Sequence, residues 1–248
     1  MKLFQKGGWN PKANPACSKC PLRFEGICVL SEGYVQAKLA VVGMHPGYKE
    51  EQLRRPFVGP SGRLFDRILR EAGIDRKDLF VGNVGNCKPK EIQVAPDVWL
   101  TKKEAEERIV KNCKTRFYQE LHHVHPRVIV AFGGLPLEVL TGKRSITKRH
   151  GALHIVDLDR ILAMHEGMDV GNWVFREDRM TYVLPVFHPA YLLRGKPQFH
   201  PILVQKFKRA KAIAAGEQPA LFREILVAPH VRDVDMVLDL AEAHTDRW

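Results

Sequence analysis

The chain has 248 residues, of which 45% are hydrophobic and 27% charged, a composition typical of a folded globular protein. This excludes a disordered or collagen-like chain, and at roughly 100–200 residues per domain it predicts one large domain or one domain with an appendage. Lysine and arginine outnumber aspartate and glutamate by 39 to 28, so the formal net charge is +11 and a polyanion such as nucleic acid is the expected partner.

Membrane and secreted classes are not expected. No apolar run approaches the roughly 20 residues of a membrane span, and the first ten residues lack the apolar centre of a signal peptide. Five cysteines are too few, and odd in number, for a secreted disulfide scaffold. The sequence therefore predicts a cytoplasmic protein in which clustered thiols are metal ligands.

The first third of the chain predicts an irregular segment followed by alternating strands and helices. The segment to about Gly33 is rich in glycine, proline, lysine and cysteine, so something other than an apolar core must hold it, and a bound metal is one candidate. Residues 38–43 are a short apolar run ending in His-Pro-Gly, typical of a buried strand that opens into a loop. Residues 64–72 have apolar side chains at helical spacing, and Gly73 can end that helix. A second strand is predicted at residues 79–84.

The rest of the chain continues this alternation. A capping box, Thr101-x-x-Glu104, predicts the start of a long helix that runs to about His123. Further strands are predicted at residues 127–133 and 181–189, and further helices at residues 136–140 and 201–215. After Gly216 the composition changes, and residues 217–248 are expected to form a helical appendage, or else a helix at residues 233–248 packs on the same core.

This order of elements predicts an α/β fold of three layers, with helices flanking a central, mostly parallel, four-stranded sheet. Residues 1–216 would form this one domain, including the cysteine-bearing N-terminal segment. Ligands in such folds bind beyond the carboxyl ends of the strands, where the His-Pro-Gly, Gly-Asn and Phe-His-Pro-Ala segments fall.

Several segments together resemble the iron–sulfur branch, family 4, of the uracil-DNA glycosylase superfamily. They are Cys17-x-x-Cys20, GMHPGYKEEQLRRPFVGPSGRLFDRIL, NVGNCKPK, PRVIVAFGGLPLEVLTG, His150-Gly151 and VFHPAYLLRG. Each motif alone is weak, and the resemblance rests on their order and spacing over residues 15 to 215. It implies a uracil-DNA glycosylase-like fold, a base flipped out of DNA and hydrolysis of its N-glycosidic bond.

A glycosylase holds the flipped base by one aromatic face and by its polar edge. Phe57 lies in a loop and is suited to stack on the base, although most phenylalanines are core residues. Asn83 ends a predicted strand, where its carboxamide offers a donor and an acceptor to a pyrimidine edge, or is simply a turn residue. Gly43 is assigned to the same base-binding set. His188 resembles the family histidine that donates to the base O2 as negative charge develops on the leaving pyrimidine.

The first loop departs from the family pattern, which typically has acidic residues where this chain has Met44 and Tyr48. His45 aligns with the catalytic aspartate of the uracil-specific branch, and Glu50 or Glu51 can supply a carboxylate that positions water. A neutral imidazole at His45 would act as a base or as an electrostatic partner of the sugar. Either the mechanism is altered or the preferred base is not uracil.

Four cysteines predict a metal site. Cys87 and Cys113 complete a set with Cys17 and Cys20, and its asymmetric spacing, unlike the paired knuckles of a zinc ribbon, fits a structural [4Fe-4S] cluster held by four thiolates, as the resemblance implies. Cys28 is left over and is expected to be a buried apolar thiol.

DNA contacts are expected near the site motifs. Leu192 falls where the superfamily has a minor-groove wedge, although it could equally pack inward, and Arg194 can meet a phosphate. The other predicted DNA-binding residues are Ser61, Lys148 and Arg149, with Lys143, Arg144 and the basic helix after residue 201 nearby.

These residues predict a monofunctional, monomeric DNA glycosylase that removes uracil or another altered pyrimidine and leaves an abasic site. One alternative is a glycosylase for a bulkier modified base in foreign DNA, since the altered first loop could reshape the pocket. The other is a DNA-binding member of the fold that has lost turnover, because Met44 and Tyr48 are not acidic.

Overall fold

The computed structural model describes residues 15–23, 26–219 and 225–226. Within these, seven strands form one sheet in the order β1-β3-β2-β6-β8-β7-β9. The strands are β1 (Glu32–Gly33), β2 (Leu39–Gly43), β3 (Phe80–Asn83), β6 (Val128–Phe132), β7 (His154–Asp157), β8 (Met180–Val186) and β9 (Ile225–Leu226). The four neighbours β3, β2, β6 and β8 are parallel, which confirms the predicted four-stranded core.

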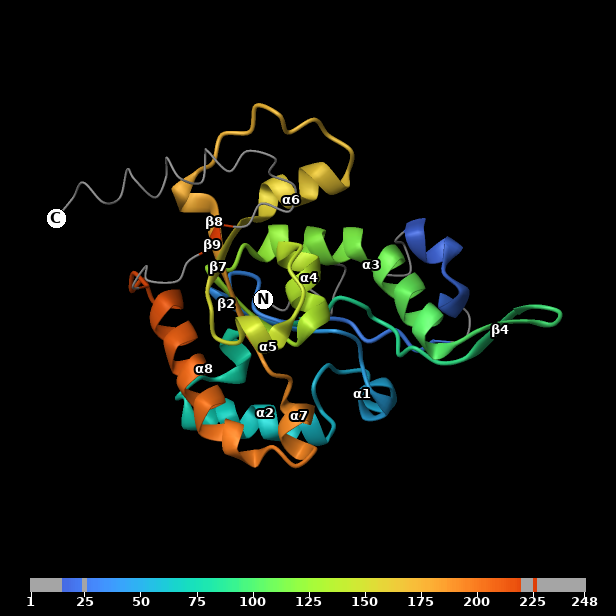
Figure 1. The fold of residues 1–248 in the computed structure, drawn as a ribbon, viewed down its shortest axis with the longest axis horizontal. Coiled ribbons are helices and arrows are strands. Elements are labelled where there is room, and N and C mark those ends of the chain that lie inside the picture. Colours follow the sequence, from blue (N-terminus) through green and yellow to red (C-terminus); the bar gives the residue numbers. More distant parts are fainter. Residues whose placement is uncertain (1–14, 24–25, 220–224, 227–248) are drawn as a thin grey trace.

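Three short strands that the sequence did not predict extend this core. β1 pairs antiparallel with β3, β7 pairs antiparallel with β8, and β9 adds to β7. A separate hairpin, β4 (Ile92–Ala95) and β5 (Val98–Leu100), projects from the body of the molecule (Figure 1). It accounts for much of the long insertion between Cys87 and Cys113.

Helices cover both faces of the sheet, as Figure 1 shows. They are α1 (Tyr48–Leu53), α2 (Pro60–Glu71), α3 (Lys102–Val124), α4 (Gly134–Thr141), α5 (Ile146–Arg149), α6 (Leu158–His165), α7 (Pro189–Leu193) and α8 (His200–Ala214). Short 3₁₀ turns lie at η2 (Pro15–Lys19), η3 (Pro21–Arg23), η4 (Arg76–Asp78), η5 (Glu177–Arg179) and η6 (Pro197–Phe199). No helix in these described ranges is long and apolar enough to cross a bilayer.

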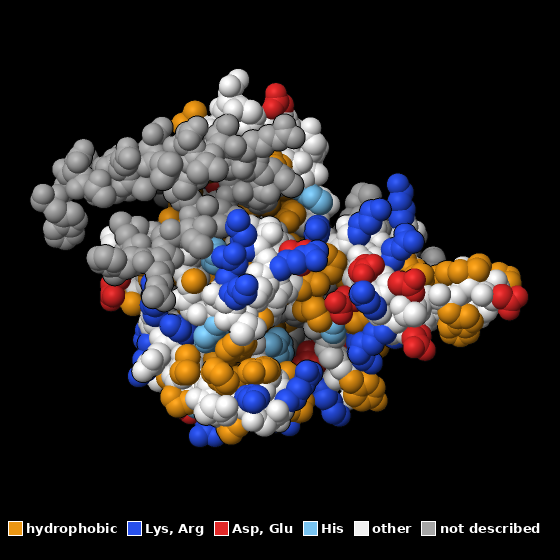
Figure 2. All heavy atoms as spheres, viewed as in Figure 1, with side chains coloured by type: hydrophobic (Ala, Val, Ile, Leu, Met, Phe, Trp, Pro, Cys, Tyr) orange, Lys and Arg blue, Asp and Glu red, His pale blue; other side chains and the backbone are white. Residues whose placement is uncertain are grey.

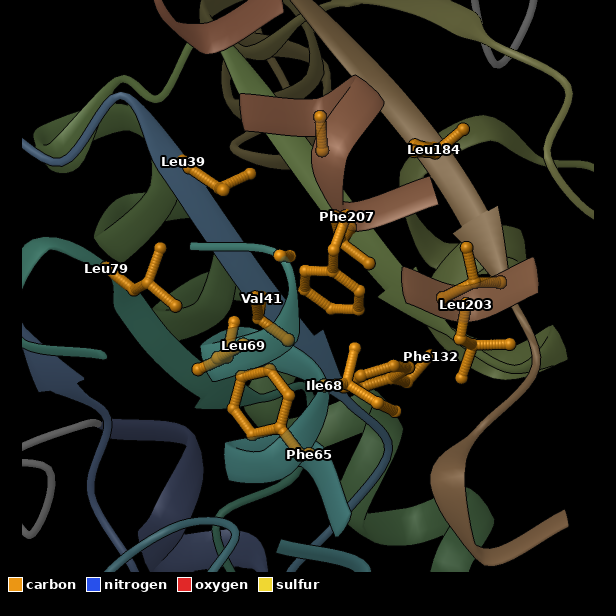
Figure 3. Close-up of a cluster of buried hydrophobic side chains, with 14 of the residues drawn as sticks. Leu39, Val41, Phe65, Ile68, Leu69, Leu79, Phe132, Leu184, Leu203 and Phe207 are labelled. Atoms are coloured by element: carbon orange, nitrogen blue, oxygen red, sulfur yellow. The ribbon is translucent and has the colours of Figure 1, made fainter. Parts of the chain in front are cut away.

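Side-chain alternation along the strands divides the core in two. Leu39 and Val41 of β2 point to the face covered by α2, α7 and α8, whereas Ala40 and Val42 point to the face covered by α3, α4 and α6. On the first face Phe65, Phe132 and Phe207 meet at the centre of the cluster (Figure 3). Burial on both faces explains why the central strands are continuous apolar runs.

The predicted long helix is confirmed as α3, including its capping box. Thr101 Oγ1 accepts from the Glu104 backbone N at 3.3 Å, and Glu104 Oε2 accepts from the Thr101 backbone N at 2.7 Å. The predicted helix at residues 233–248 lies outside the described residues. Of the predicted appendage, residues 225–226 form β9 at the edge of the sheet.

Candidate active site

The carboxyl ends of β2 and β3 place Gly43 and Asn83 side by side, because the two residues pair in the sheet register. A Cβ added to Gly43 would lie 2.5 Å from Asn83 Oδ1 and 2.7 Å from Phe57 Cζ. Asn83 is buried at the end of β3. The absence of a side chain at residue 43 therefore lets the Asn83 amide and the Phe57 ring approach the end of β2 closely.

Phe57 is held in an unusual backbone conformation. Its φ is 53°, in the left-handed region that a phenylalanine seldom adopts. Arg76 stabilises this turn by donating to the backbone oxygens of Phe57 at 2.9 Å and Pro56 at 2.6 Å. Gly62 is required beneath it, since a Cβ there would lie 2.0 Å from the Phe57 oxygen. Such locally strained residues occur at functional sites, where the surrounding structure fixes them.

Glu50 joins the loop after β2 to the loop that carries Phe57. Its Oε1 accepts from the backbone N of Val58 at 2.9 Å and of Gly59 at 2.7 Å, and its Oε2 accepts from the backbone N of Gly47 at 3.2 Å. Three of about four lone-pair positions of the carboxylate are thus used within the protein. Glu50 therefore stabilises the loop that carries Phe57. Its predicted part in positioning water stays a prediction.

His188 follows β8 and caps α7. Its Nδ1 accepts from the backbone N of Ala190 at 3.0 Å, so the neutral ring carries its proton on Nε2. Burial, and then the neighbouring His45 and Arg194, lower the pKa of His188 to about 4, while Glu50 opposes this shift. The ring stacks on Phe57 with 5.9 Å between centroids. At neutral pH His188 is therefore a neutral hydrogen-bond donor beside Phe57.

His45 lies in the loop after β2, as predicted, but with a neighbour that sequence reasoning missed. Its Nε2 is 3.4 Å from Glu106 Oε2 on α3, and its Nδ1 is 3.1 Å from the Pro46 oxygen. No role was predicted for His150, whose Nδ1 accepts from the backbone N of Phe187 at 3.1 Å and whose ring stacks on that phenylalanine. The His-Gly motif was a signal for His150, whereas nothing in the sequence singled out Glu106.

A buried ion pair supports the strand end that carries Asn83. Arg116 of α3 is paired with Glu120, which also accepts from Ser31 Oγ at 2.9 Å. Its guanidinium donates to the backbone oxygens of Asn83 at 2.8 Å and Val84 at 2.7 Å. Burial of this cation is offset by the carboxylate and by these carbonyls.

The cysteines converge next to this ion pair. Burial, and then the thiols of Cys113, Cys28 and Cys20, raise the pKa of Cys17 to about 11. The Cys87 thiol donates to the Cys28 sulfur, which raises the pKa of Cys87 and lowers that of Cys28. Within the described ranges no group of three or more metal-ligating side chains is arranged as a finished site. Arg116 opposes the effect of burial, because its charge lowers the pKa of Cys17, Cys28 and Cys113, and four neighbouring thiols are the donors that an iron–sulfur cluster takes.

The prediction that Leu192 projects as a wedge is wrong for this structure. Leu192 is 4% exposed and lies in the core cluster, as the inward-packing alternative requires. The physical reason is helical spacing: α7 packs on α2 through Pro189 and Leu192, three residues apart on one face. The exposed side chains of α7 are those of Tyr191 and Leu193, and Leu193 is 53% exposed.

The remaining predicted DNA contacts lie at the surface or close to it. Lys148 and Arg194 are exposed, while Ser61 and Arg149 are half-buried. Figure 2 shows basic side chains over α4 and α5, a hydrophobic patch over α7, and histidine side chains between them. This face of the molecule thus combines positive charge with apolar side chains.

Comparison with known proteins agrees with this arrangement. The family model described as "Uracil DNA glycosylase superfamily" matches residues 30–215. A type-4 uracil-DNA glycosylase of Thermotoga maritima is 30% identical over 205 residues, covering 81% of this chain and 91% of the relative. A type-4 enzyme of Sulfurisphaera tokodaii is 28% identical over 206 residues, covering 80% of each chain. The chain belongs to the uracil DNA glycosylase superfamily.

Proposed function

We propose that this protein hydrolyses the N-glycosidic bond of uracil flipped out of DNA, releasing free uracil and leaving an abasic site. The observation that carries the proposal is the convergence of Gly43, Asn83, Phe57 and His188 at the carboxyl ends of the parallel strands. The names of the type-4 relatives support uracil as the base.

Each group has a part in the reaction. Uracil enters over Gly43 and stacks on Phe57, while the Asn83 carboxamide accepts from the base N3–H and donates to O4. Cytosine has the opposite polarity at these atoms, so the same amide orientation rejects it.

Bond cleavage leaves the electron pair on the base. As the bond between C1′ and N1 breaks, negative charge develops on uracil, and Nε2–H of His188 donates to O2. The lowered pKa keeps that ring neutral, so it stabilises the anion as a hydrogen-bond donor. Water then adds to C1′ of the sugar, and the proton that it loses balances the negative charge of the released uracil.

The cysteines serve structure in this proposal. Cys17, Cys20, Cys87 and Cys113 would hold a [4Fe-4S] cluster that links the N-terminal segment, the loop after β3 and α3. The cluster would supply cross-linking of these segments. DNA would bind as single or double strands over Ser61, Lys148, Arg149 and Arg194, and the protein would act as a monomer.

The test uses oligonucleotides that carry one altered base each, with abasic sites revealed by alkaline cleavage. We expect release of uracil under single-turnover conditions and a loss of about 10²-fold or more in His188→Ala, with little change in DNA affinity. Preferential release of a bulkier pyrimidine would replace uracil as the substrate. Tight DNA binding without release of any base would instead support a non-catalytic DNA-binding protein.

A further inference from the structure

The short helix α1 adds no buried side chain to the hydrophobic core. None of its six residues, all of which the structure describes, is buried, and Tyr48 and Leu53 are 61% and 60% exposed. Core packing therefore does not explain these side chains. The start of the helix is nevertheless fixed, because Glu50 accepts from the backbone of Gly47 and from the loop that carries Phe57.

Tyr48 lies at the edge of the sheet where the base is proposed to bind. Gly43 and Asn83 pair in the register of β2 and β3. Five residues further along the two loops that follow these strands come Tyr48 and Lys88. The loops meet there, because Lys88 Nζ lies 5.5 Å from the centroid of the Tyr48 ring. Both side chains thus belong to the carboxyl edge of the sheet, where ligands bind in folds of this kind.

Two ammonium groups from different segments lie near this exposed ring. Lys49 Nζ is 5.8 Å from the ring centroid and donates to Gln52 Oε1 at 2.9 Å. Lys88 Nζ is 3.9 Å from Glu51 Oε2, which is longer than a hydrogen bond. Each ammonium has three donors, so both lysines can also donate to a phosphate. An isolated exposed aromatic residue needs no explanation, but one that lies among cations has the composition of a surface that binds a nucleic-acid strand.

We propose that Tyr48 is a DNA-binding residue on which a nucleobase next to the flipped uracil stacks, while Lys49 and Lys88 contact the adjacent phosphates. The inference rests on the proposed function and deepens it. A base that leaves the stack deprives its neighbour of a stacking partner, and an exposed aromatic ring can replace that partner. The family pattern typically has an acidic residue at this position, so the stacking contact would be a property of this chain.

Fluorescence of a base analogue tests the stacking contact directly. The probes are single-stranded oligonucleotides in which 2-aminopurine stands on the 5′ or the 3′ side of 2′-fluoro-2′-deoxyuridine, whose glycosidic bond resists hydrolysis. Stacking on an aromatic ring quenches 2-aminopurine. At saturating protein one of the two probes should therefore be brighter with Tyr48→Ala than with the wild-type protein, and Tyr48→Phe should restore the quenching. Equal fluorescence with wild-type and Tyr48→Ala protein on both probes would overturn the stacking role.

Affinity for the same oligonucleotides supplies a second measurement. It should fall about tenfold in Tyr48→Ala, the scale of one base stacked on an aromatic side chain. Tyr34→Ala is the matched control, because Tyr34 is 43% exposed and its backbone N donates to the Leu79 oxygen just before β3, at the opposite edge of the sheet. Equal losses in the two variants would show that Tyr48 has no specific contact with DNA.

The salt dependence of binding tests the lysines. Lys88→Gln should lower the slope of log affinity against log salt concentration by about 0.7, the contribution of one phosphate contact on a single strand. Lys77→Gln is the control, since Lys77 is exposed before β3 and pairs with Asp75. An unchanged slope in Lys88→Gln, or the same change in both variants, would overturn the phosphate contact. If the wild-type protein releases no base from uracil-containing DNA, the proposed function fails, and these binding measurements still decide whether Tyr48 and Lys88 contact DNA.

Discussion

The substitution Gly43→Ala tests whether the base enters between Phe57 and Asn83. The added methyl carbon would lie 2.5 Å from Asn83 Oδ1 and 2.7 Å from Phe57 Cζ, closer than side-chain carbons approach such atoms in folded proteins. Neither neighbour yields easily. Asn83 is buried at the end of a paired strand, and Arg76 and Gly62 fix the turn at Phe57.

Two effects of different size follow from this geometry. Overpacking of this kind costs typically about 1–3 kcal/mol of stability, which the domain should tolerate. A base displaced by about 1 Å loses about 10²-fold in rate, because the donors no longer meet their acceptors. We therefore expect a folded variant whose base release falls at least a hundredfold while its DNA affinity stays within a factor of a few.

The assay is single-turnover uracil release from a labelled oligonucleotide, with DNA affinity and thermal unfolding measured on the same preparations. Gly134→Ala is the matched control, because an added Cβ at this glycine after β6 has no atom within 4 Å. Wild-type release by Gly43→Ala, or an equal loss in Gly134→Ala, would refute a base site between Phe57 and Asn83.

Three further predictions concern the duplex, the cysteines and pH. Leu193→Ala should impair base release from double-stranded DNA more than from single-stranded DNA, because the Leu193 side chain is exposed. Equal losses on both substrates would contradict a role of Leu193 on the duplex. Leu192→Ala should instead lower the free energy of unfolding by about 2–5 kcal/mol, because Leu192 is buried. Cys113→Ala should lose bound iron and visible absorbance, measured by iron analysis and spectroscopy, and Cys28→Ala should retain both; a colourless Cys28→Ala protein would reverse the ligand assignment. Burial lowers the pKa of His154 to about 4 in the folded protein. As the pH drops from about 6.5 towards 4, the unfolded chain therefore binds a proton at His154 that the folded chain does not, and stability should fall. In His154→Leu the free energy of unfolding, measured in urea, should fall less steeply as the pH drops, by up to about 1.4 kcal/mol per pH unit. The same slope as in the wild-type protein would show that His154 does not contribute.

Sequence patterns predicted the parts of the fold that bury apolar side chains on both faces. The four parallel strands read as continuous apolar runs, and α3 carried a capping box, so both were predictable. β1 and β9 have two residues each, too short for a periodic signal. β7 contains a buried histidine and an aspartate, which the pattern of an apolar strand does not include.

The candidate site was predictable where residues follow strands. Gly43, Asn83 and His188 come at or just after strand ends, and parallel strands bring such positions to one edge. Glu106 could not be predicted, because a glutamate within a run of charged residues on a helix resembles a solvated face. Leu192 was misplaced because the sequence does not reveal which face of so short a helix is buried.

Arg116 shows why the cysteines and the base pocket must be considered together. Its guanidinium reaches the carbonyl oxygens of Asn83 and Val84 and the Glu120 carboxylate at once, which requires the planar, many-donor geometry that lysine lacks. The same cation is electrostatically coupled to Cys113, one turn earlier in α3. A cluster that fixes Cys113 would therefore also fix the rotation of α3 that directs Arg116 to the end of β3. Under the proposed function the cysteines would support base recognition without touching the base, because Arg116, on the same helix as Cys113, donates to the backbone at the strand end that carries Asn83.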